Sequence, residues 1–190
     1  MLIRHSLPGF RNRVLLSMAS LFVPQFDEML PRHNNILAVL ENEGGERLLI
    51  PAHNIVTDAG DIWYAQKSAG ESPTNNFNTM VLCSAGTPGK SAIYSSFTAI
   101  AGSTKTVAAG YPKTADADAD NTGDAANVVT WLGSWAKADF NHAAVSHGLI
   151  TIASAISGSA LLTGYAFSAP FAKTANDTLK VFVNHQMLGV

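Results

Sequence analysis

Downstream of residue 47, apolar residues come in short runs separated by turn-forming residues. The run Leu48 to Thr57 stops at the cluster Asp58-Ala59-Gly60-Asp61, which is typical of a turn. Further along, residues 128–140 place Val129, Trp131, Gly133, Trp135 and Lys137 at alternating positions. Side chains alternate between the two faces of a strand, so this segment is expected to carry two tryptophans on one face. The remaining strand candidates are 62–66, 77–83, 148–153, 161–167 and 179–185.

The spacing of these candidates indicates the fold class. They follow one another at intervals of roughly ten to twenty residues, with Gly, Ser, Asn and Asp between them. The pattern favours antiparallel strands over alternating strands and helices. The sequence therefore predicts an all-β domain, an antiparallel sandwich or jelly roll, over residues 47–190.

The first 46 residues differ in pattern and are expected to form an extended or partly helical arm. All five arginines of the chain lie before residue 48 and all seven lysines lie after it. Pro24 and Pro31 prevent a long helix between residues 20 and 33, and Gly44-Gly45 marks the expected boundary. Basic residues followed by an apolar stretch also resemble an export signal, but no convincing cleavage site follows. We expect the arm to contact a neighbouring subunit through Arg4, Arg11, Arg13, Leu15, Leu16, Phe22 and Phe26.

The amino-acid composition argues against several classes of function. Only 14% of the 190 residues are charged, 47% are hydrophobic and the formal net charge is −2. Ordinary soluble domains carry about 25% charged residues. The charge balance gives no electrostatic footprint for nucleic acid, and the apolar stretch 14–23 is too short to span a bilayer. A surface so poor in charge suits a subunit that neighbouring proteins cover.

One cysteine and one glycine-containing stretch partly match the patterns of a catalytic nucleophile and of a nucleotide-binding loop. Cys83 follows Met80, Val81 and Leu82, so we interpret it as a buried apolar residue and not as a nucleophile. The stretch 84–91, SAGTPGKS, ends like a phosphate-binding loop, but Ser84 stands where the first glycine belongs. We interpret it as a turn between strands, with a nucleotide-binding enzyme as a remote alternative.

The remaining candidates are an acidic stretch, the histidines and the aromatic residues. Asp116, Asp118 and Asp120 match three positions of a calcium loop, but the glycine and glutamate of that loop are missing. His142 and His147 have the wrong spacing for metal ligands on a helix, and Asp139 near His142 is too common a pairing to indicate catalysis. Trp63, Tyr64, Trp131 and Trp135 are expected in the core, although a carbohydrate-binding platform is an alternative. We therefore expect no catalytic residue, no cofactor and no metal.

Four stretches carry a resemblance to a known class of protein. They are residues 54–71 (NIVTDAGDIWYAQKSAGE), 118–131 (DADNTGDAANVVTW), 137–140 (KADF) and 173–190 (KTANDTLKVFVNHQMLGV). Over roughly residues 50–190 the chain resembles small virion proteins of tailed bacteriophages, which are encoded among the head and tail structural genes and mostly lack an assigned function.

The resemblance implies a structural, non-enzymatic role in the virion, above all as a capsid decoration or cement protein. The expected partners are the major capsid protein, other virion subunits and copies of the protein itself, with no direct role for nucleic acid or membrane. The alternative within the same class is a tail, adaptor or fibre-base component.

Overall fold

The computed structural model describes residues 36–107, 113–114 and 128–186. Within these residues the strands form one antiparallel sheet in the order β4-β3-β8-β9-β2-β1-β10-β7-β6, and β5 pairs with β3 outside this path. The all-β antiparallel fold expected from the sequence is confirmed. The elements are β1 (Ile36–Glu41), β2 (Arg47–Val56), α2 (Asp58–Ser68), β3 (Phe77–Gly86), η2 (Tyr94–Ser96), β4 (Phe97–Ala99), β5 (Lys105–Thr106), β6 (Lys113–Thr114), β7 (Val128–Trp135), β8 (His142–Ile152), β9 (Leu161–Lys173) and β10 (Thr178–Gln186).

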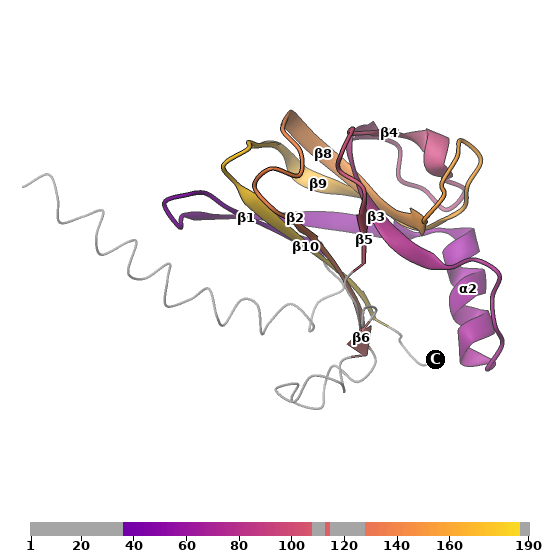
Figure 1. Cartoon of the computed structure of the whole chain (residues 1–190). Coiled ribbons are helices and arrows are strands. Elements are labelled where there is room, and N and C mark those ends of the chain that lie inside the picture. Colours follow the sequence, from indigo (N-terminus) through magenta and orange to yellow (C-terminus); the bar gives the residue numbers. More distant parts are fainter. Residues whose placement is uncertain (1–35, 108–112, 115–127, 187–190) are drawn as a thin grey trace, which may run out of the picture.

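The sheet curls into a half-barrel, so that strands far apart in the sheet order come together (Figure 1). Ser103, in the loop before β5, joins the two sides. Its hydroxyl donates to the Leu82 carbonyl on β3 at 2.9 Å, and its carbonyl accepts from Trp135 Nε1 on β7 at 2.7 Å. The concave side holds the main core, in which Trp131 and Trp135 are each 1% exposed.

The boundary expected at residue 46 moves toward the N-terminus. Strand β1, which the sequence analysis assigned to the arm, pairs with β2 on one side and with β10 on the other. Gly44-Gly45 is the turn of the β1–β2 hairpin, and Gly45 has a φ of 76°, which glycine adopts without strain. The folded domain therefore includes Ile36 and everything after it that the structure describes.

The second correction concerns residues 58–68, for which the sequence analysis expected a turn and a strand. They form α2, whose N-cap is Thr57: its hydroxyl accepts from the Gly60 amide at 3.1 Å. Asp58 and Asp61 lie in the first turn, where the helix dipole favours negative charge. Figure 1 shows α2 at one end of the sheet and the β1–β2 turn at the other.

Helix α2 places Trp63 and Tyr64 against the core. The Trp63 ring lies 6.1 Å from Phe77 and 6.0 Å from Trp131, measured between ring centroids. Gly60 allows the close approach of the helix, because a Cβ there would lie 2.2 Å from the Leu162 carbonyl oxygen on β9. The helix thus closes one end of the half-barrel.

Candidate interaction surface

The convex side of β7, β10, β1 and β2 carries a continuous apolar strip. The inner face of these strands contributes Trp131, Val183, Ala38 and Ile50 to the core, so the alternate residues point the other way. The strand register places Leu132 opposite Phe182, Phe182 opposite Leu37, and Leu37 opposite Pro51. We call these four residues the outer apolar row.

A second pair of residues widens the row. Val39 lies opposite Leu49 and packs with it, Leu37 and Phe182 in one apolar cluster outside the core. Leu37 and Val39, on the central strand β1, are only 4% and 9% exposed. The ends of the row are more open, because Pro51 is exposed and Leu132 is partly buried. The row is therefore nearly buried at its centre and accessible toward Leu132 and Pro51.

On the other half of the convex side, a segment of the same chain covers the strands. Residues 87–99 lie over β3, β8 and β9 and close a second small core with Val81, Cys83, Leu149 and Leu161. Phe97 is the main contact, since its ring occupies the space above Gly86 and Gly164. Among the described residues, no corresponding segment packs on the outer apolar row.

Cys83 and residues 84–91, which partly match a catalytic nucleophile and a nucleotide-binding loop, have structural roles. Cys83 is buried, and burial raises the pKa of its thiol to about 12, which keeps it protonated and unreactive. The interpretation of Cys83 as a buried apolar residue is confirmed. Residues 84–86 finish β3, and a loop followed by η2 and β4 comes after them in place of a helix. Lys90 pairs with Asp61 at 2.5 Å, so residues 84–91 are the expected turn between strands.

The four aromatic candidates, Trp63, Tyr64, Trp131 and Trp135, form no exposed platform. Trp131 and Trp135 are buried, and the expectation of core packing is confirmed for both. Trp131 Nε1 donates to the Tyr64 hydroxyl at 3.2 Å, and that hydroxyl lies 2.6 Å from His185 Nδ1. His185 is 3% exposed, and its Nε2 has no hydrogen-bond partner within the described part of the chain. Burial lowers the pKa of this imidazole to about 4.

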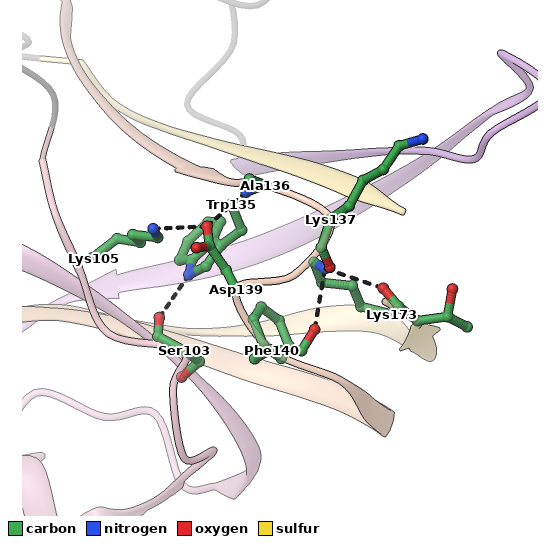
Figure 2. Close-up of polar contacts among 9 residues, drawn as sticks. Ser103, Lys105, Trp135, Ala136, Lys137, Asp139, Phe140 and Lys173 are labelled. Atoms are coloured by element: carbon green, nitrogen blue, oxygen red, sulfur yellow. Dashed lines mark hydrogen bonds and ion pairs between the residues drawn. The ribbon is translucent and has the colours of Figure 1, made fainter. Parts of the chain in front are cut away.

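Asp139 and Lys173 lie in a polar cluster that fixes the loop between β7 and β8 (Figure 2). The Asp139 carboxylate accepts from the Ala136 amide at 2.6 Å and pairs with Lys105 at 2.7 Å. These contacts hold the pKa of Asp139 below its usual value, with the Lys105 hydrogen bond contributing most. The Asp139 carboxylate therefore holds the loop between β7 and β8 in place.

Lys173 is fully buried, an unusual position for a lysine. Its ammonium group donates to the carbonyls of Lys137, Phe140 and Thr174, each at 3.1 Å, and lies 4.9 Å from the centroid of the Phe140 ring. All three of its protons are used, although desolvation lowers its pKa. The group has no donor left for a substrate.

His142 and His147 lie on the same strand, β8, and make separate contacts. His142 begins β8, where its Nδ1 accepts from the Ala144 amide at 3.1 Å. His147 lies beside Ser146, whose hydroxyl is 2.8 Å from His147 Nδ1. In the part of the chain that the structure describes, no group of three or more His, Cys, Asp or Glu residues is arranged to hold a metal ion. Asp116, Asp118 and Asp120 lie outside that part.

The expected interface residues also lie outside the described residues, as all of them precede Ile36: Arg4, Arg11, Arg13, Leu15, Leu16, Phe22 and Phe26. The sequence analysis missed the outer apolar row. The signal was present, because ILAVL in β1 and RLLIP in β2 are apolar at both parities, which indicates strands covered on both faces.

Comparison with known proteins adds no relative. No protein-family model matches the chain, and neither the curated proteins nor the solved structures give a match. Within the described residues, no helix is long and apolar enough to cross a membrane.

Proposed function

We propose that this protein is a non-enzymatic structural subunit of a bacteriophage particle, and that it decorates and stabilises the head shell. The sequence resemblance to small virion proteins supports the proposal. The observation that carries it is the outer apolar row, a contact surface that the described part of the domain leaves without a partner segment. Its partners would be the major capsid protein and further copies of the same chain.

The physical chemistry of the surface fits this role. Burial of one Leu or Phe side chain contributes about 1.5–3 kcal/mol, a weak contact by itself. A particle repeats each contact by symmetry, so that many weak contacts hold a subunit in place. The low charge of the chain limits the repulsion between copies packed side by side.

The decisive experiment locates the protein in purified particles. Mass spectrometry gives its copy number, and electron cryomicroscopy shows whether its density lies on the shell, at a vertex or along the tail. We expect density on the shell. Absence from the particle would refute a virion role altogether, while density confined to the tail would replace decoration by the tail or adaptor alternative.

A matched pair of variants tests the contact surface. Phe182→Asp places a charge in the middle of the outer apolar row, and Thr98→Asp places the same charge on the exposed strand β4, away from the row. A loss of about 2 kcal/mol per contact weakens that contact by roughly 30-fold. We expect the first variant to have reduced copy number and the second to have normal copy number, with near-ultraviolet circular dichroism confirming that both are folded.

A further inference from the structure

The outer apolar row lies next to the point where the N-terminal segment joins the domain. Strand β1 begins at Ile36, and the next residue, Leu37, is the centre of the row. Any chain that precedes Ile36 therefore starts beside this surface. The sequence immediately upstream contains the most apolar stretch of that region, residues 14–23, VLLSMASLFV.

We propose that residues 14–23 of the same chain dock on the outer apolar row. The inference concerns the free protein: a docked segment would occupy the surface that the proposed particle contact uses, and would have to leave the row before that contact forms. Its first support is chemical, because two apolar surfaces of one molecule lose their contact with water when they meet. Its second support is charge: exposed Lys180 lies on the same face as the row, and Asp27 and Glu28 follow the docking segment.

The connection is long enough for the segment to fold back. Residues 24–35 span up to about 40 Å when extended, at 3.3–3.6 Å per residue. The row crosses four strands, which is about 14 Å at the usual spacing of 4.7–4.9 Å between neighbours. The connection contains Pro24, Pro31 and Asn34-Asn35, residue types that favour a change of direction.

Docking of residues 14–23 from the same chain is favoured over docking of the same segment from a second copy. A flexible connection of this length holds the segment at an effective concentration in the millimolar range, well above the micromolar concentration of free protein in an assay. Exchange of the segment between copies would reproduce the same contact between two molecules, which is how segment swapping joins subunits at low cost. In the dilute protein, docking is intramolecular.

Cross-linking of the full-length protein tests the proposal. Ser20→Cys with Pro51→Cys places one thiol in the segment and one at the exposed end of the row, and Ser20→Cys with Ala99→Cys is the control on β4. The native Cys83 is buried and remains silent. With a short bismaleimide at micromolar protein, we expect an intrachain cross-link in the first pair and at least fivefold less in the control.

The other outcomes overturn the proposal. Equal yields in the two pairs would show that the segment has no preferred site, and cross-links only between molecules would show that a second copy supplies it. A second measurement uses Leu15→Asp with Leu16→Asp in the first pair, compared with Ser17→Asp alone. We expect the double substitution to abolish the cross-link and to raise the fluorescence of an apolar dye several-fold, whereas Ser17→Asp leaves both signals unchanged. An unchanged cross-link in the double variant would refute docking through the apolar contact.

Discussion

The buried imidazole of His185 makes the stability of the domain sensitive to mild acid. Its Nδ1 faces the Tyr64 hydroxyl at 2.6 Å, and its Nε2 has no partner among the residues that the structure describes. Burial lowers its pKa to about 4, although the charge of Asp61 acts in the opposite direction. In the unfolded chain the same group has a pKa near 6.5. Between these two values the unfolded state binds more protons than the folded state, so stability falls as the pH falls.

The size of the effect follows from the difference between the two pKa values. Each unit corresponds to about 1.4 kcal/mol, so acidification from pH 7 to pH 4 removes about 3 kcal/mol of the free energy of unfolding. Domains of this size are stable by about 5–15 kcal/mol, and the loss is therefore measurable. Asp139 and Asp177, whose pKa values are lowered, lose their contributions progressively as the pH falls through the usual carboxyl range and below it.

Urea unfolding at several pH values between 7.5 and 4.5, followed by tryptophan fluorescence, measures the effect. His185→Asn keeps an acceptor near the Tyr64 hydroxyl but does not titrate, so we expect a smaller loss of stability with acid than in the unmodified protein. His53→Asn makes the same change at an exposed position of β2 and should leave the loss unaltered. The same pH dependence in His185→Asn and in the unmodified protein would refute the assignment to His185.

Three further predictions concern packing, the buried lysine and the acidic segment. Gly148→Ala should destabilise the domain by about 1–3 kcal/mol, because the new Cβ would lie 2.3 Å from a tyrosine ring, whereas Gly158→Ala, in open space, should change the urea midpoint little. Lys173→Met should lower stability by about 3 kcal/mol or more in thermal unfolding, since three carbonyls lose their donor, and a loss no larger than that of the exposed Lys180→Met would contradict this. Removal of divalent ions with EDTA should leave the melting temperature unchanged if residues 114–126 bind no calcium, and a calcium-dependent rise of several degrees would show that they do.

Short apolar runs predicted most of the longer strands, because each of these strands has one face in the core. The expected strand at 179–185 corresponds to Thr178–Gln186, and that at 48–57 to Arg47–Val56. The alternation in 128–140 also placed Trp131 and Trp135 on the inner face. The strand ends were less predictable, since β9 continues to Lys173 through residues that face solvent.

The wrong predictions arose where one short sequence pattern is compatible with two different structures. Asp58-Ala59-Gly60-Asp61 contains turn-forming residues, but after Thr57 the same acidic residues favour the first turn of a helix. Gly44-Gly45 was interpreted as a domain boundary, although a tight hairpin needs the same backbone freedom. Apolar residues at both parities of β1 and β2 indicated strands covered on both faces, but the sequence alone could not join them into the outer apolar row, because the row also depends on the register with β7 and β10.

The position of β1 in the middle of the sheet has a consequence for how the chain folds. Its partner β10 is the last of the described strands, and nearly the whole described chain lies between them. During synthesis the β1–β2 hairpin leaves the ribosome first and presents an open edge and an uncovered inner face until β10 follows. Such distant pairing slows folding and prolongs exposure to aggregation. Completion of the sheet therefore waits for β10, and a chain that stops short of β10 would leave one edge of β1 unpaired.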